Sequence, residues 1–196
     1  MGQPRFSSSA YLTIATGLLI ALLAVFSSWT FPLLSLERSQ VSHEFWRILT
    51  CNFVHFGWAH TLMNLAAFLL CSFALLIHFS ASRFTVLFLG CCIVVGTGVY
   101  FLNPEYETYA GLSGAIHGFI IAGLLLNKRH AYWVNAIFIA LTFAKIIYEH
   151  QADYQETQLQ ELLPVAVAYD AHLYGALAGL VIGIFYLIVD KINAKH

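Results

Sequence analysis

A serine and a histidine that lie far apart in the chain could together carry out nucleophilic chemistry. Ser113 follows Gly111 and Leu112 and precedes an apolar run, so it should occupy the first turn of a helix. Unpaired N–H groups and the positive dipole end of such a turn could stabilise a developing oxyanion. Taken alone, the segment fits equally well with Ser113 as an N-cap before a glycine-rich packing face. A nucleophile needs a base, and His172 is the candidate.

Depth and helix packing predict that these two residues meet. Counting back from Asp190 places His172 about 27 Å above the inner membrane boundary, within roughly 6 Å of the height expected for Ser113. Small residues recur at every fourth position on both segments, which permits close backbone approach. They include Gly114, Gly118, Gly175 and Gly179. Because such faces are common packing devices, catalysis is favoured only by the agreement of depth, helix face and chemistry.

A second polar cluster enters an earlier apolar run. His60 and Asn64 are four residues apart, so they share one helix face, and both side chains can donate hydrogen bonds. Polar groups buried in lipid are costly and usually functional, so we expect this pair to stabilise an oxyanion. His55, just upstream, is expected to be an interfacial histidine that ties the outer loop by a hydrogen bond.

The composition is that of a membrane protein. The 196 residues are 60% hydrophobic and 10% charged, with a formal net charge of −1. Soluble domains are nearer 45–50% apolar and about 25% charged. A soluble enzyme is therefore excluded, and no basic surface suggests nucleic acid as a partner.

Six apolar runs predict six helices in one domain that covers 1–196. The fourth run has 14 residues from Ser113 to Leu126. It would be about 21 Å long against about 30 Å of hydrocarbon, so it cannot cross alone and should start below the outer surface, under a cavity. The runs fall at about 10–34, 58–79, 84–102, 111–126, 131–148 and 170–189.

The distribution of basic residues predicts the orientation. With the N-terminus inside, six basic residues lie in cytoplasmic segments and two in outer loops, so both termini should be cytoplasmic. Lys145, near the outer end of the fifth run, is expected to snorkel to the interface. The inner six are Arg5, Arg83, Lys128, Arg129, Lys191 and Lys195, and the outer two are Arg38 and Arg47.

Three motifs in register resemble the rhomboid intramembrane serine proteases. They are HFxxxHxxxN at 55–64, GLSG at 111–114 and AHxxGxxxG at 171–179, and Trp46-Arg47 is similar to a pair in the family's first outer loop. Agreement of three motifs is strong where each alone is weak. The resemblance covers about 45–190 and implies an all-α membrane protein, a six-transmembrane-helix rhomboid-like bundle with a short, submerged fourth helix.

The resemblance also implies a role for each motif residue. Ser113 would be the nucleophile and His172 the general base, without cofactor or metal. His60, Asn64 and the Ser113 amide would form the oxyanion hole, which Gly111 supports. The resemblance also implies a place in the bacterial inner membrane, with the active site opening to the periplasm.

Position 117 departs from the wider family, which often has a tyrosine there. His117, together with the compact chain, is similar to the rhombosortase branch. Members of that branch are associated with exported proteins that end in a GlyGly motif, an apolar helix and a basic tail. His117 would be a stacking platform or an alternative base. The long acidic loop 149–169 also departs from the family's short hydrophobic cap.

The expected chemistry is a Ser-His dyad that cleaves transmembrane segments of membrane or exported proteins. Asp170 is two residues from His172 and should point elsewhere, so a dyad fits better than a triad. Substrate would enter sideways from lipid, past the fifth helix. Water would hydrolyse the acyl-enzyme, and another amine in its place would give transpeptidation.

Other classes of membrane protein fit the sequence less well. A zinc protease needs HExxH, which is absent, and an aspartyl protease needs two intramembrane aspartates. A small transporter would show repeated halves. A general rhomboid protease with other substrates, or an inactive rhomboid-like membrane-protein binder, remains as an alternative.

Overall fold

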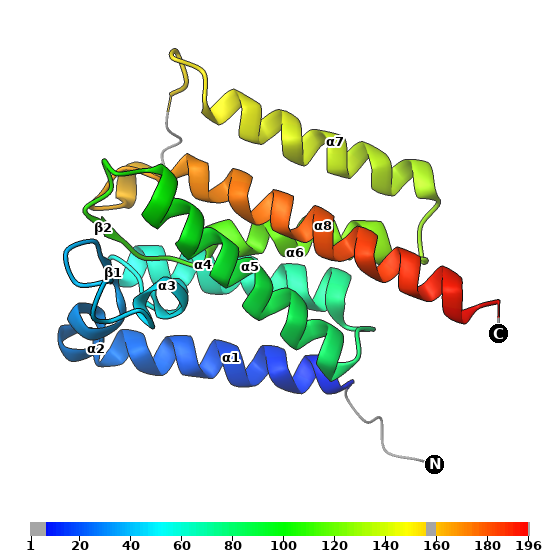
Figure 1. Cartoon of the computed structure of the whole chain (residues 1–196), viewed down its shortest axis with the longest axis horizontal. Helices are drawn as coiled ribbons and strands as arrows, with labels where there is room; N and C mark the ends of the chain where they lie inside the picture. Colours follow the sequence, from blue (N-terminus) through cyan, green and yellow to red (C-terminus); the bar gives the residue numbers. More distant parts are fainter. Residues whose placement is uncertain (1–6, 156–159, 196) are drawn as a thin grey trace.

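The computed structural model describes residues 7–155 and 160–195, and these are mostly helical (Figure 1). Arg5 lies outside the described residues, as does the middle of the loop 149–169. The elements in order are α1 Ser8–Val25, α2 Ser27–Leu34, β1 Leu36–Glu37, α3 Arg47–Thr50, the 3-10 turn η1 Cys51–Phe53, α4 Gly57–Cys71, the π-helical turn η2 Ser72–Leu76, α5 Ala81–Leu102, β2 Thr108–Tyr109, α6 Ser113–Leu126, α7 Tyr132–Glu149, the 3-10 turn η3 Gln160–Leu162 and α8 Tyr169–Asn193.

Five helices among the described residues are long and apolar enough to cross a membrane: α1, α4 with η2, α5, α7 and α8. The sixth apolar helix, α6, has 14 residues, of which ten are buried. A helix that is apolar on all sides belongs in the interior of a bundle. That α6 makes a sixth, submerged crossing stays a prediction.

The first apolar run is not one helix, which corrects the expected span at 10–34. α1 ends at Val25 and α2 begins at Ser27. The Thr30 hydroxyl donates hydrogen bonds to the carbonyls of Leu23 (2.7 Å) and Phe26 (3.2 Å). A side chain that bonds these carbonyls competes with the helical backbone, and this explains the break.

Glycines bring α6 and α8 into backbone contact. A Cβ on Gly114 would lie 2.7 Å from the Ala171 carbonyl oxygen, and one on Gly118 would lie 2.5 Å from that of Gly175. In return, a Cβ on Gly175 or Gly179 would overlap a carbonyl of α6. We call this contact the glycine seam. It fixes the height of α8 relative to α6, and therefore of His172 relative to Ser113.

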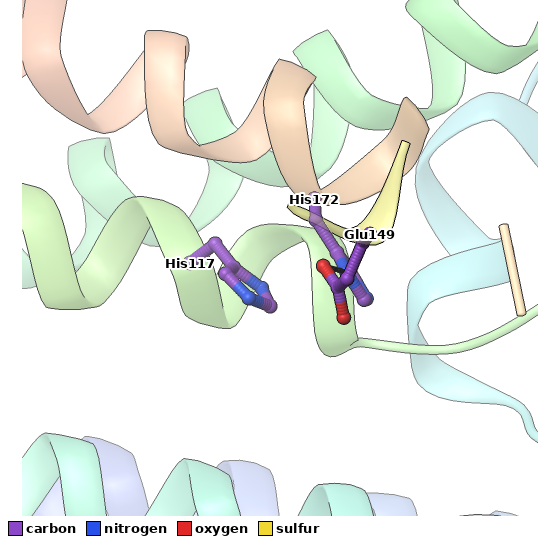
Figure 2. Close-up of side chains that lie close together, drawn as sticks. All are labelled: His117, Glu149 and His172. Atoms are coloured by element: carbon purple, nitrogen blue, oxygen red, sulfur yellow. Dashed lines mark hydrogen bonds and ion pairs between the residues drawn. The ribbon is translucent and has the colours of Figure 1, made fainter. Parts of the chain in front are cut away.

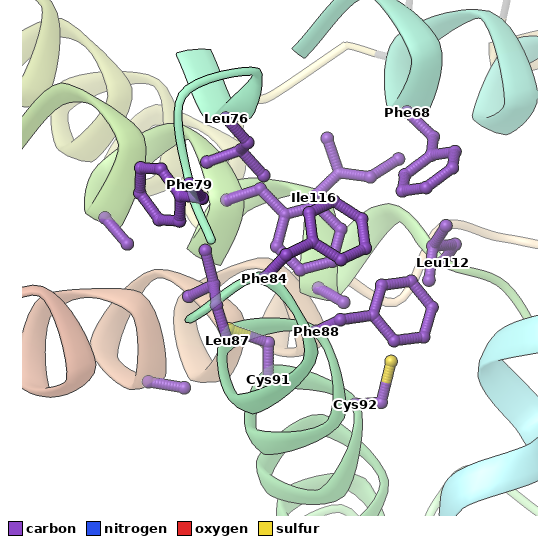
Figure 3. Close-up of a cluster of buried hydrophobic side chains, with 14 of the residues drawn as sticks. Phe68, Leu76, Phe79, Phe84, Leu87, Phe88, Cys91, Cys92, Leu112 and Ile116 are labelled. Atoms are coloured by element: carbon purple, nitrogen blue, oxygen red, sulfur yellow. The ribbon is translucent and has the colours of Figure 1, made fainter. Parts of the chain in front are cut away.

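An aromatic core lies beside the glycine seam, where α4 and α5 pack against α6 (Figure 3). The ring centroids of Phe88 on α5 and Phe119 on α6 are 5.6 Å apart, and those of Phe68 on α4 and Phe88 are 6.0 Å apart. Cys91 and Cys92 are buried free thiols in the same core. The α6 helix thus packs against α4, α5 and α8.

Two arginines shape the connections that lead into the site. The buried guanidinium of Arg47 donates to Glu44 (2.5 Å) and to the Ser35 carbonyl (2.7 Å). The guanidinium of Arg38 bonds four carbonyls at and just beyond the end of α5, where a cation is favourable. The β1 strand pairs antiparallel with β2, four residues before Ser113. These contacts attach the first connection to the segment that enters α6.

The described ends of the chain lie at one end of the bundle (Figure 1). At that end Arg83 forms an ion pair with Asp190, and both line a pocket with Lys128 and Arg129. The N-terminus of α6 lies at the opposite end. Arg83, Lys128 and Arg129 thus lie at the end of the bundle away from Ser113, and the orientation of the chain in the membrane stays a prediction.

The glycine seam predicts that Gly175→Ala destabilises the protein. The added methyl overlaps the Gly114 carbonyl, a backbone atom that cannot move aside. We expect the free energy of unfolding in detergent to fall by about 1–3 kcal/mol.

Gly17→Ala is the matched control, because it adds the same methyl group at a different helix–helix contact. Its Cβ would meet only the Leu65 and Leu69 side chains, at 3.4 and 3.5 Å. Stability should be unchanged or higher by up to about 1 kcal/mol, because alanine is the better helix former. Equal stability of Gly175→Ala and Gly17→Ala in thermal unfolding would contradict the close seam.

Candidate active site

Ser113 begins α6 directly after a strained turn. Gly111 has a φ of +132°, which a side chain rarely adopts, and a Cβ there would lie 2.8 Å from the His60 ring. The Gly111 N–H donates to the Cys51 carbonyl at 2.9 Å. The turn therefore needs glycine, both for its backbone angle and for the close approach of His60.

His55 fastens the same turn. Its Nε2 accepts a hydrogen bond from the Leu112 N–H at 3.4 Å, which is the loop-tying role expected of it. The side chain is buried rather than interfacial. Burial, reinforced by the neighbouring His60, lowers the pKa of His55 to about 3. His55 is therefore neutral at physiological pH and can act as an acceptor.

The predicted contact between Ser113 and His172 is present. The distance from Ser113 Oγ to His172 Nε2 is 3.2 Å. His172 lies in the first turn of α8 and is buried. A neutral imidazole with a free lone pair on Nε2 could accept the Ser113 proton, provided that its other nitrogen carries the hydrogen.

The other nitrogen of His172 faces Glu149, a residue that the sequence analysis did not identify. Glu149 is the last residue of α7, and its Oε2 is 2.9 Å from His172 Nδ1 (Figure 2). A carboxylate only accepts, so Nδ1 carries the hydrogen and Nε2 is the acceptor. The three side chains form a continuous hydrogen-bonded chain from Ser113 through His172 to Glu149.

Asp170, the acid that the sequence analysis weighed, lies elsewhere as expected. It accepts a hydrogen bond from Tyr106 (3.3 Å) and faces His150 (3.4 Å). Glu149 could have been found from a different signal. It lies four residues after Lys145 near the end of an apolar run, and charges in such a place need a partner.

Lys145 contacts the site, which differs from the role expected of it. Although its side chain is half exposed, its ammonium donates to Glu149 Oε1 (2.6 Å) and to His117 Nε2 (3.2 Å). It therefore forms an ion pair within the bundle and does not simply reach toward the membrane interface.

His117 lies flat against His172. Their ring centroids are 4.1 Å apart and the rings are inclined by 22°. The Nδ1–H of His117 donates to the Ser113 carbonyl at 2.8 Å, and its Nε2 accepts from Lys145. Since both nitrogens have partners, the contacts favour the stacking platform over the alternative base.

His60 and Asn64 face the same cavity as Ser113. Both line a cavity of about 210 Å³ with Ser113, His117 and His172. His60 Nδ1 accepts from the Phe56 N–H at 3.4 Å, which leaves the hydrogen on Nε2. One N–H of Asn64 donates to the His60 carbonyl at 3.1 Å, so the second is free to donate. Both side chains can therefore supply a donor.

A larger cavity opens on the other side of Ser113. Its volume is about 460 Å³, and Ser113 and His60 belong to both cavities. The second half of the loop 149–169 covers them, since Leu163 and Val167 line both. An extended peptide segment could reach Ser113 from either cavity.

A metal ion has candidate ligands here. One atom each of His117, Glu149 and His172 lie within 4.8 Å of one another. The ammonium of Lys145 already bonds two of these three residues. A divalent ion would have to displace that positive charge, so the donor set fits a metal poorly.

Comparison with known proteins places the chain in a family. Residues 42–189 match the Rhomboid domain family, which includes every residue of the site. The chain is also 26% identical over 161 residues to "Putative rhomboid protease YdcA" of Bacillus subtilis (strain 168), covering 78% of this chain and 72% of that protein. Members of the matching family are intramembrane serine proteases, and this chain, an integral membrane protein by its apolar helices, belongs to the rhomboid family.

Proposed function

We propose that the chain is an intramembrane serine endopeptidase with Ser113 as nucleophile and His172 as general base. The observation that carries the proposal is the 3.2 Å contact between Ser113 Oγ and His172 Nε2 at the N-terminus of α6. Activation of a serine requires a base within hydrogen-bonding distance, with the base in turn oriented by a third group. The bond from Glu149 to His172 Nδ1 supplies that orientation.

Acylation proceeds with a proton transfer at each stage. Ser113 Oγ attacks the scissile carbonyl carbon as His172 Nε2 takes its proton. The tetrahedral intermediate collapses, the C–N bond breaks, and His172 returns the proton to the leaving amine. The intermediate carries a negative oxygen, which His60 Nε2, the free N–H of Asn64 and the Ser113 amide stabilise.

Deacylation repeats these steps with water. His172 removes a proton from water, the hydroxyl attacks the acyl carbon, and the ester bond breaks as Ser113 regains the proton. An amine in place of water would give transpeptidation. The two cavities around Ser113 offer room for a peptide on one side and water on the other.

The proposed substrates are transmembrane or C-terminally anchored proteins that reach Ser113 from the lipid. They would pass α7, which packs against α6 and α8 at the edge of the bundle (Figure 1). The presence of His117 where the wider family often has a tyrosine supports the rhombosortase-like assignment, whose substrates end in a GlyGly signal. Placement in a bacterial inner membrane with the site toward the periplasm belongs to the same proposal. A general rhomboid protease or an inactive binder is the alternative.

Labelling with a fluorescent fluorophosphonate tests the Ser-His pair without a substrate. Ser113→Ala should abolish labelling, and His172→Ala should slow it by about 10²–10⁴-fold, the range of general base catalysis. Ser72→Ala, which removes a buried serine at the start of η2, is the control and should label normally.

Two results would contradict the assignment. Normal labelling of Ser113→Ala would place the reactive serine elsewhere. Labelling that survives His172→Ala but is lost in His117→Ala would show that His117 is the base.

Two membrane-anchored reporters test the substrate class. One carries a GlyGly-apolar-basic tail, and in the other both glycines are leucine. Glycine disfavours a helix by about 1 kcal/mol, so the GlyGly segment should unwind with about 2 kcal/mol less cost and be cleaved about thirtyfold faster. Cleavage is read on a gel beside Ser113→Ala as the blank. Equal processing of the two tails would count against the GlyGly assignment.

A chelator tests whether a metal takes part. Because Lys145 bonds both His117 and Glu149, EDTA should leave the labelling rate unchanged. Loss of labelling in EDTA that added Zn²⁺ restores would mean that His117, Glu149 and His172 hold a metal.

A further inference from the structure

We propose that Glu149 is a positioning residue that completes a Ser113–His172–Glu149 triad, and that Lys145 sets which oxygen of Glu149 faces His172. The inference rests on the proposed function and deepens it. It assigns the third group of the triad to α7, a different helix from those that carry Ser113 and His172.

The burial of Glu149 supports a specific task for its charge. Its side chain is 1% exposed, and each carboxylate oxygen has its own partner. Oε1 accepts from Lys145 at 2.6 Å and Oε2 accepts from His172 at 2.9 Å. A carboxylate is costly to bury unless it is paired, and here one of its two oxygens serves the imidazole of His172.

The hydrogen bond from Glu149 fixes the tautomer of His172. A carboxylate accepts only, so Nδ1 must keep its hydrogen and Nε2 must present its lone pair to Ser113 Oγ. When Nε2 takes the serine proton, the imidazolium that forms lies 2.9 Å from a negative charge. Glu149 therefore orients the base and stabilises its protonated form, without itself taking the proton.

Lys145 determines which oxygen of Glu149 is left to face His172. Its ammonium can only donate, so the atom of residue 149 that faces it must be an oxygen. His117 holds the ammonium from the other side, because its Nδ1–H is bound to the Ser113 carbonyl and its Nε2 must accept. Lys145 and His117 thus determine together how the Glu149 side chain is turned.

The α7 helix is the least embedded of the candidate spans. Only 17% of its 18-residue window is buried, against 28–39% for the other four in the described chain. The bond between Glu149 and His172 ties the end of this helix to α8. A movement of α7 away from the bundle would separate the two groups, so the base is oriented only while α7 is docked.

The Glu149→Gln variant tests the tautomer argument. Lys145 should hold the amide oxygen, so the NH₂ group faces His172 Nδ1 and donates to it. The hydrogen of His172 then moves to Nε2, which can no longer accept the Ser113 proton. Replacement of the acid by its amide in a Ser-His-Asp triad costs about 10⁴-fold, and we expect labelling here to slow by at least about 10²-fold.

A second substitution should partly reverse this loss. In the double variant Glu149→Gln with Lys145→Met, nothing holds the amide oxygen, and the amide can turn its oxygen toward His172 Nδ1. The double variant should label at least about tenfold faster than Glu149→Gln alone, a non-additive effect that a purely structural ion pair would not produce. The labelling rate of Lys145→Met alone should fall less than that of Glu149→Gln, because the carboxylate of Glu149 remains.

The variants are compared by second-order rate constants of fluorophosphonate labelling across a pH series. Glu149→Gln should gain rate as the pH rises, since hydroxide can replace the blocked base. Asp170→Asn is the matched control, because it removes an acid near His172 that bonds Tyr106, and it should label like the wild type. Glu149→Asp, which keeps the charge, should label faster than Glu149→Gln.

The outcomes separate this inference from the proposed function. Labelling of Glu149→Gln at the wild-type rate, while Ser113→Ala stays unlabelled, would overturn the triad and leave the Ser-His pair intact. A double variant no faster than Glu149→Gln would overturn the role of Lys145. If Glu149→Gln unfolds at the assay temperature, Glu149→Asp decides, because its shorter side chain withdraws the carboxylate from His172 Nδ1. Slower labelling of Glu149→Asp than of the wild type supports the triad, and labelling at the wild-type rate would overturn it.

Discussion

The α6 and α8 helices meet without side chains between them, and this contact sets where the residues of the site lie. Gly114 and Gly118 meet Gly175 and Gly179 at backbone distance, so the two helices cannot slide past each other by a fraction of a turn. That fixed register brings an imidazole from one helix to the first residue of the other. The aromatic core borders this contact and packs α4 and α5 against α6.

Charges near the apolar bundle are placed where they fasten segments together. Arg47 closes the first connection, and Arg38 caps the end of α5 beside the segment that leads to Ser113. Lys145 and Glu149 do the same for α7, but their partners are the two stacked histidines of the site. In a medium of low dielectric an unpaired charge is costly, so such pairs hold their groups in one arrangement. The position of α7 and the orientation of the His172 ring therefore depend on the same contacts.

The sequence predicted those features that depend on spacing along one helix. The four-residue spacing of small residues predicted the close approach of two helices, and depth predicted that Ser113 and His172 would meet. Glu149 was missed because it belongs to a third helix and lies 23 residues before His172, so its contact depends on how α7 docks. The break after Val25 was missed for a local reason, because the Thr30 hydroxyl replaces a backbone donor in a run that remains apolar.

A structure of the phosphonylated protein in a lipid nanodisc would show whether Ser113 is the nucleophile that His172 activates. We predict a bond between phosphorus and Ser113 Oγ, with the phosphonyl oxygen facing His60 and Asn64 and with His172 still between Ser113 and Glu149. A phosphorus bound to another residue would rule out Ser113 as the nucleophile, and a His172 ring turned away from Ser113 in the adduct would rule out His172 as its base.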